Sequence, residues 1–357
     1  MTSHGGRVLL VAGTTRTASI EGISAAGADP DAMVHTPGAD AEIVTYGEPV
    51  RAGVVPVSPT GCPTPAVVTR AVREVVGFEF ATVDAGLAGE TAAPTIDVGA
   101  SPGCDVRNPE AVPDAGSIFD AARSLGATLP GDHLRVAESI PGGTTTALGV
   151  LEVLGERASV SSSLPSNPLA LKREVVGDGL EASGLCPGEC AGDPVRAIRS
   201  VGDPVLAAVA GLAVGAGEAG ASVRLAGGTQ QLAAAALARH AGFAGRLVVS
   251  TTTYIAGDDS ADVRALADDV DADLVVTDPG FAGEEHVVAR RFETGEAKDG
   301  VGMGETLRMA ADAGALPAVR ERIERVYDRM LAEDDAPARS DTDNSRAANN
   351  YSTDDGS

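Results

Sequence analysis

Short runs of apolar, mostly β-branched residues alternate along this chain with longer stretches rich in Ala and Leu. The apolar runs predict strands over residues 7–13, 53–57, 78–84, 158–162, 222–226, 246–250 and 273–277. Most of these runs are continuously apolar rather than alternating with polar residues. That pattern is typical of parallel strands that are covered on both faces.

The Ala- and Leu-rich stretches predict helices over residues 65–76, 145–154, 204–214, 230–240, 261–269 and 316–331. Gly155 and Gly242 follow two of them and are suited to left-handed helix ends. The alternation of strands and helices predicts an α/β fold with a mostly parallel, doubly wound sheet and helices on both faces. We expect residues 1–333 to form a single domain, and the acidic and polar tail at 334–357 to be disordered.

The composition narrows the classes of partner. The net charge is −24, and all basic residues except Lys172 and Lys298 are arginines. An acidic, Lys-poor surface is typical of proteins from a salt-rich cytoplasm, where carboxylates keep the surface hydrated. Nucleic acids and anionic membranes require basic patches, so we expect neither as a partner. No apolar stretch has the length of a signal peptide or a membrane span, so we expect a soluble, cytoplasmic protein.

The four cysteines carry no recognisable site. Cys186 and Cys190 are too far apart for a redox pair, and no second Cys or His pair follows at a spacing suited to zinc. We expect reduced thiols, and neither a metal nor a cofactor.

One turn stands out for its chemistry. It runs from Glu138 through Gly142, Gly143, Thr144 and Thr145 into a predicted helix. Two glycines allow a ligand to approach the backbone, and the free N–H groups of a helix start suit a phosphate. The alternative is a packing turn in which Thr144 caps the helix.

Other turns repeat this pattern. Gly227, Gly228 and Thr229 join a predicted strand to a helix, and Asp278 ends another strand. Ligands of open parallel sheets lie at the carboxyl ends of the strands, so these turns are candidate binding positions. Lys172, which follows a Ser-rich segment, is either a phosphate partner or an exposed lysine.

A carboxylate next to a flexible turn is a candidate general base. Asp299 precedes Gly300 and Gly302 in such a turn, and Glu138 precedes the glycines described above. Solvated acidic loops are the alternative for both. A G-x-G-x-x-G pattern at residues 215–220 follows a helix and precedes a strand, which is the reverse of a dinucleotide-binding site.

Taken in order, segments 22–27, 56–70, 138–148, 161–172, 226–230 and 299–302 resemble the archaeal branch of the nicotinate-nucleotide–dimethylbenzimidazole phosphoribosyltransferase family. The resemblance spans residues 7 to about 330. Bacterial members carry the motif Glu-Met-Gly-Ile-Gly-Asn-Thr-Thr. Glu138 matches its glutamate, Gly142 its second glycine, and Thr144 and Thr145 its threonines, whereas Gly143 replaces its asparagine.

The resemblance implies a Rossmann-like domain with a small helical subdomain, usually in a homodimer. It implies transfer of phosphoribose from nicotinate mononucleotide to a benzimidazole base, giving α-ribazole phosphate for the lower ligand of cobamides (vitamin B12). The bacterial base is the glutamate of a Glu-Gly-Thr-Gly turn, which Asp299 matches here with a side chain one methylene shorter. Glu138 is then expected to stabilise the oxocarbenium-like transition state electrostatically.

Three alternatives stay open from the sequence. The first is a transferase that uses another base acceptor. The second is a non-catalytic nucleotide-binding or sensing protein on the same fold, favoured by the shorter Asp299 and by Gly143. The third, a nicotinamide-dependent oxidoreductase, lacks a correctly placed glycine fingerprint.

Overall fold

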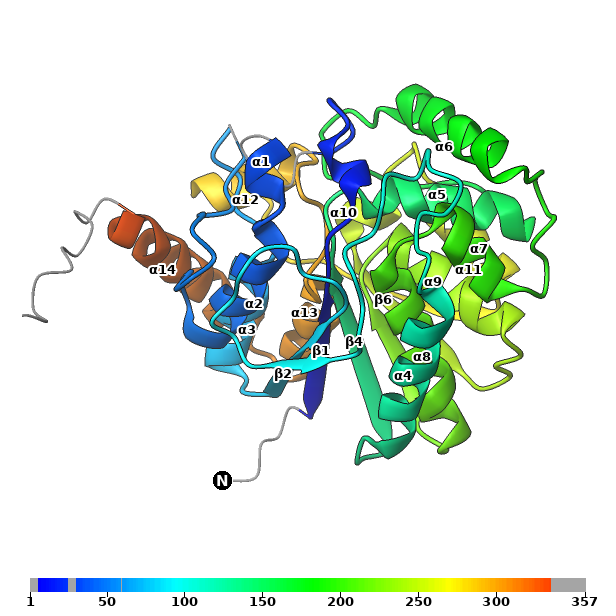
Figure 1. Cartoon of the computed structure of the whole chain (residues 1–357). Coiled ribbons are helices and arrows are strands. Elements are labelled where there is room, and N and C mark those ends of the chain that lie inside the picture. Colours follow the sequence, from blue (N-terminus) through cyan, green and yellow to red (C-terminus); the bar gives the residue numbers. More distant parts are fainter. Residues whose placement is uncertain (1–5, 25–29, 59, 335–357) are drawn as a thin grey trace, which may run out of the picture.

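Seven parallel strands form one sheet in the order β3-β2-β1-β4-β5-β6-β7 (Figure 1). The structure is a computed structural model that describes residues 6–24, 30–58 and 60–334. The strands are β1 (Arg7–Ala12), β2 (Glu79–Asp84), β3 (Thr95–Asp97), β4 (His133–Ser139), β5 (Ser222–Ala226), β6 (Leu247–Thr252) and β7 (Ala272–Thr277). Of the tail predicted over residues 334–357, residue 334 ends the last described helix and residues 335–357 lie outside the described residues.

Helices cover both faces of the sheet, as predicted (Figure 1). One layer contains α4 (Ala115–Thr128), α5 (Gly143–Leu154), α8 (Pro204–Glu218), α9 (Thr229–His240) and α11 (Val263–Asp269). The other contains α2 (Thr36–Tyr46), α3 (Ala66–Val75), α13 (Met303–Asp312) and α14 (Leu316–Asp334). Within the first, α6 (Leu169–Ser183) and α7 (Pro194–Val201) pack against α5 and form a small helical part. The sheet thus has a separate hydrophobic core on each side.

Strand β1 shows why both faces are apolar. Leu9 and Val11 belong to the core under α8 and α9, whereas Val8, Leu10 and Ala12 belong to the core under α3 and α13. Successive strand side chains point to opposite faces, so a strand buried on both sides needs a continuous apolar run.

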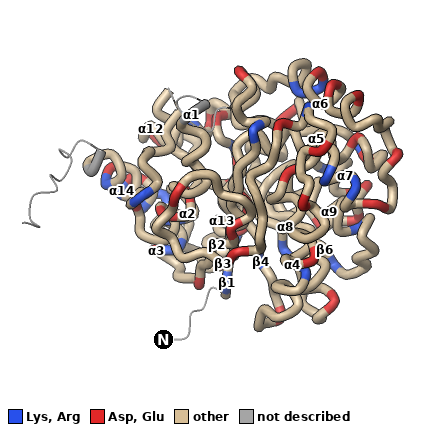
Figure 2. Tube along the Cα trace, in the orientation of Figure 1, with Lys and Arg blue, Asp and Glu red and all other residues tan. Residues whose placement is uncertain are grey.

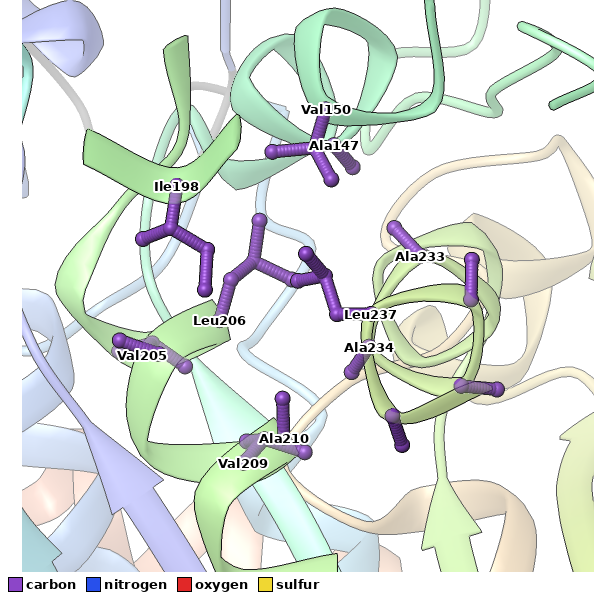
Figure 3. Packing of buried hydrophobic residues seen from close by; sticks show 14 of the residues in the cluster. Ala147, Val150, Ile198, Val205, Leu206, Val209, Ala210, Ala233, Ala234 and Leu237 are labelled. Atoms are coloured by element: carbon purple, nitrogen blue, oxygen red, sulfur yellow. The ribbon is translucent and has the colours of Figure 1, made fainter. Parts of the chain in front are cut away.

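Small side chains allow close packing in a core with few aromatics. Figure 3 shows side chains of α5, α7, α8 and α9 meeting in one cluster, whose labelled members are Ala147, Val150, Ile198, Val205, Leu206, Val209, Ala210, Ala233, Ala234 and Leu237. Gly211 lies against the backbone of α4, where a Cβ would come within 2.4 Å of Phe119 O.

Charged residues of both signs lie along the outer helices α6 and α14 (Figure 2).

Two strand predictions were wrong. Residues 53–57 form a loop in which only Val57 makes an isolated bridge, to Pro63. Residues 158–162 form a loop that is half-buried at 158–159 and buried at 160–162. Side chains satisfy the backbone of Ser161 there: Thr229 Oγ1 accepts from Ser161 N, and Lys172 Nζ donates to Ser161 O. The structure instead has β4, whose polar residues concealed it, and the three-residue strand β3.

Candidate functional site

A cleft opens at the carboxyl ends of β1 and β4, where the strand order reverses direction. Strand β2 pairs with one edge of β1, whereas β4 pairs with the other edge of β1. Ligands of doubly wound sheets bind at such a switch point. The cleft is lined by the loop at 56–65, the β4–α5 turn, the Ser-rich loop at 161–163, the start of α9 and the turn at 296–301.

Glu138 carries the first carboxyl group of the cleft. It lies near the end of β4 and is 6% exposed, and its carboxyl group accepts no hydrogen bond from the described part of the chain. Its carbonyl oxygen accepts from Val301 N at 3.0 Å, which joins β4 to the turn that contains Asp299. Burial, reinforced by the charges of Asp299, Asp203 and Asp40, raises the pKa of Glu138 to about 8.

Asp299 carries the second carboxyl group, and the backbone holds it firmly. One oxygen accepts from Thr251 Oγ1 at 2.8 Å, and the other accepts from Gly300 N and Gly304 N at 2.8 and 3.1 Å. Burial outweighs these hydrogen bonds and raises the pKa of Asp299 to about 6. Near neutral pH, Asp299 is therefore the ionised member of the pair and Glu138 the protonated one.

The turn that carries Asp299 has an unusual backbone. Ala297, Lys298 and Val301 have φ values of 57°, 40° and 50°, and Gly300 and Gly302 also have positive φ. Left-handed conformations of residues other than glycine are costly and concentrate at functional sites. Here they bring Asp299, Gly300 and Val301 into the wall of the cleft.

The Gly- and Thr-rich turn also lies in the wall. Gly142 is the N-cap of α5 with φ 80°, and a Cβ there would lie 2.9 Å from Ala18 N. Gly143 and Thr144 line the cleft, so helix N–H groups start at its edge. Thr145 is fully buried, and its Oγ1 has no hydrogen-bond partner among the described residues. The cap is a glycine, so Thr144 does not serve as the cap.

The start of α9 faces this turn from the neighbouring helix. Gly228 and Thr229 line the cleft together with Gln230, whereas Gly227 lies behind them, where a Cβ would be 3.2 Å from Glu138 Oε1. Gln230 was not predicted from the sequence, since glutamine has no diagnostic spacing. Two helix N-termini thus converge on one cleft.

Besides Thr145 and Gly227, three further predicted site residues lie outside the lining of the cleft. Asp278 is exposed beyond β7, and Gly302 is the N-cap of α13 behind Val301. Lys172 is fully buried in α6, and its Nζ donates to Ser161 O at 2.7 Å, so it is neither an exposed lysine nor in the cleft. Burial and the nearby Lys298 lower the pKa of Lys172 to about 7. Lys172 therefore supports the Ser-rich loop from behind.

Asp40 of α2 is a further carboxyl group of the cleft that sequence reasoning missed. Its two oxygens accept from Ser139 Oγ and Thr64 Oγ1, both at 2.6 Å, and burial raises its pKa to about 6. It ties the end of β4 to the loop at 56–65. No glycine-rich turn marks it in the sequence.

The described residues contain no recognisable set of metal ligands. Within residues 6–24, 30–58 and 60–334, no three His, Cys, Asp or Glu side chains are grouped to hold a metal ion. All four cysteines are free thiols: Cys62 and Cys190 are buried, Cys104 is half-buried and Cys186 is exposed. None of the described helices is long and apolar enough to cross a membrane.

No protein-family model matches the chain. It is 59% identical over 323 residues to a UPF0284 protein of Halobacterium salinarum, covering 90% of this chain and 97% of that protein. A UPF0284 protein of Methanosarcina mazei is 41% identical over 307 residues, covering 85% and 88% of the two chains.

Among solved structures, the nicotinate-nucleotide-dimethylbenzimidazole phosphoribosyltransferase of Thermus thermophilus has a similar fold. One structure has a TM-score of 0.57 at 18% identity, covering 88% of this chain and 82% of that one. A structure of CobT from the same organism gives a TM-score of 0.58, also at 18% identity, with 88% and 83% covered. The Rossmann-like fold that the sequence resemblance implied is therefore confirmed.

Proposed function

This chain belongs to the UPF0284 protein family, and we propose that it transfers phosphoribose from nicotinate mononucleotide to a benzimidazole base. The products are nicotinate and α-ribazole phosphate. The observation that carries the proposal is the pair of buried carboxyl groups, Glu138 and Asp299, at a cleft formed by two helix N-termini. The cleft occurs in a fold shared with a phosphoribosyltransferase of that specificity.

The cleft offers neutral donors for an anion. The first N–H groups of α5 and α9 have no partner within their helices, and helix dipoles favour negative charge at those ends. Neither Lys172 nor Lys298 lines the cleft. We place the phosphate at these helix N-termini, with Thr144 and Thr229 as the adjacent hydroxyl groups.

The bond to nicotinate breaks without a general acid. The electron pair of the C–N bond returns to the pyridinium nitrogen, and nicotinate leaves with a neutral ring nitrogen. Positive charge develops on the ribose, and a carboxylate beside it stabilises that charge in a water-poor site. Glu138 has this role: the positively charged pyridinium ring of the substrate favours its ionised form, and it loses its proton when the substrate binds.

The acceptor base then attacks the same ribose carbon with a ring-nitrogen lone pair. Its other ring nitrogen loses a proton, and Asp299 accepts it as the carboxylate that is ionised near neutral pH. Asp40 holds Ser139 and Thr64 in place around the two substrates. Positioning of both substrates supplies much of the remaining acceleration. The homodimer implied by the resemblance stays a prediction.

Product analysis tests the proposal. Purified protein in molar KCl is incubated with nicotinate mononucleotide and, separately, dimethylbenzimidazole, a purine or a phenol, and products are identified by mass. We expect α-ribazole phosphate from the benzimidazole. Turnover only with another acceptor would change the substrate assignment, and binding without turnover on any acceptor would support a sensor instead.

A further inference from the structure

The side chain of Gln230 has a buried donor without a protein partner. Gln230 is the second residue of α9 and lines the cleft. Its Nε2 atom is shielded from solvent and makes no hydrogen bond to any described residue. Leaving such a group unpaired is unfavourable, so buried amides without partners are rare and require an explanation.

The position of this amide is set by a glycine on the facing helix. A Cβ on Gly143 would overlap Gln230 Nε2, which shows that the carboxamide fills the space beside the first residue of α5. The amide therefore lies where the N-termini of α5 and α9 converge. The carboxyl groups that line the same cleft, those of Glu138, Asp299, Asp40 and Glu296, make no hydrogen bond to it.

We propose that Gln230 is a specificity-determining residue whose Nε2 donates a hydrogen bond to an anionic oxygen of the bound nucleotide. This inference rests on the proposed function for the identity of the nucleotide. The oxygen belongs either to the phosphate or to the carboxylate of the nicotinate ring, both of which are acceptors only. A protein without a lysine in the cleft thus adds a neutral, directional donor to the two helix ends.

The adjacent Gln231 does not share this role. It is fully buried and also unpaired at both amide atoms, but it points behind Gly227 and does not line the cleft. The assignment to Gln230 therefore depends on two features together, an unpaired donor and a place in the wall of the cleft.

Calorimetric titration of nicotinate mononucleotide in molar KCl tests the inference, using wild type, Gln230→Met and Gln230→Glu. Met keeps the length and removes the donor, so we expect Kd to rise about tenfold to a hundredfold, as for a hydrogen bond to a charged group. Glu places a charge beside the anion, so we expect a larger loss. Binding by Gln230→Met within about twofold of wild type would overturn the inference.

Two analogues distinguish the sources of the oxygen. Nicotinamide mononucleotide lacks the ring carboxylate, and nicotinate riboside lacks the phosphate. If the phosphate is the acceptor, Gln230→Met should still weaken the binding of nicotinamide mononucleotide but should not weaken the binding of nicotinate riboside. The reverse pattern would assign the carboxylate. A loss of equal size with both analogues would indicate a general structural defect and would overturn the inference.

A double-mutant cycle tests the placement against Gly143. We expect Gly143→Ala to weaken binding in the wild type by displacing the amide, but to have little further effect in Gln230→Ala. Additive losses would overturn the placement. The added Cβ also lies 2.7 Å from Ile140 Cγ2, so thermal melting must first show that each variant folds.

The outcomes separate this inference from the proposed function. Wild-type binding without turnover, combined with a loss in Gln230→Met, would retain the inference and reject the transferase. Turnover by the wild type, with no loss of nucleotide binding in Gln230→Met, would retain the transferase and reject the inference. Absence of wild-type binding would reject both.

Discussion

The substitution Asp299→Asn removes the proposed base while changing little else. Asparagine has nearly the same shape, and its carbonyl oxygen retains acceptor capacity toward Gly300 N and Gly304 N. Its amide group, however, takes no proton from the attacking base near neutral pH. The amide nitrogen also replaces the oxygen that accepts from Thr251 Oγ1, a hydroxyl that rotates and accepts in turn.

The expected loss of activity follows from the role of Asp299 as general base. General-base catalysis contributes about 10²–10⁴-fold, so kcat in Asp299→Asn should fall by about that factor. Binding of nicotinate mononucleotide should change by less than about threefold, since Asp299 acts on the acceptor. Equal losses in binding and in kcat would instead indicate that the turn at 297–302 has a structural role.

The pH profile supplies the decisive readout. In the empty site the pKa is about 6 for Asp299 and about 8 for Glu138, and both groups act as carboxylates. The kcat/KM of the wild type should therefore rise tenfold per pH unit between about 6 and 8, and a hundredfold per unit in a steeper limb below about 6. The variant should lack the steeper limb. Asp120→Asn, at an exposed position of α4, is the matched control and should retain both rate and profile. Persistence of the steeper limb in Asp299→Asn would refute the assignment of the base.

Three further predictions concern Glu138 and Gly142 of the cleft and Asp203, the buried N-cap of α8. Glu138 has a pKa of about 8, so wild type should release up to about one proton when it binds the pyridinium ring of the nucleotide at pH 7, seen as a buffer-dependent enthalpy of binding. Glu138→Gln should lack this proton release, and an unchanged value would contradict the role of Glu138. Gly142→Ala should lower the free energy of unfolding by about 1–3 kcal/mol in denaturant titrations, since a Cβ meets the backbone of Ala18 and φ is positive, and no loss would contradict that geometry. Burial raises the pKa of Asp203 to about 6, so its folded state retains a proton longer than the unfolded chain, and stability falls as pH rises from about 4 to 6. Asp203→Asn should flatten that decline by on the order of 3 kcal/mol at fixed salt, whereas an unchanged slope would show that Asp203 does not titrate there.

Much of the fold was predictable because the sheet is buried on both faces. Continuous apolar runs identified β1, β2, β5, β6 and β7, and glycine ends marked α5 and α9. Strand β4 escaped because Arg135 and Glu138 interrupt it, the first to pair with Glu305 and the second to reach the cleft. Functional and paired polar residues in a strand hide it from an apolar pattern.

The candidate site was only partly accessible to sequence reasoning. Glycine-rich turns indicated Gly142, Gly143, Gly228 and Asp299, because only a few residue types can form a tight turn. Asp40 comes from α2, at a helix position with no local signature, and only the fold brings it to the cleft. Gln230 directly follows the predicted turn at Gly227–Thr229, but glutamine itself has no diagnostic spacing. Lys172 was predicted as a phosphate partner because the chain has only two lysines. The number of lysines, however, does not indicate the direction in which their side chains point.

The most direct test of the proposed transferase activity is acceptor-dependent release of nicotinate from nicotinate mononucleotide by the purified protein in molar KCl. Wild type is compared with Asp299→Asn, with and without dimethylbenzimidazole. We expect wild type to release nicotinate and form α-ribazole phosphate in equal amounts, only when the benzimidazole is present, and at least a hundredfold faster than the variant. Tight binding of the nucleotide with no release of nicotinate on any acceptor would contradict this expectation.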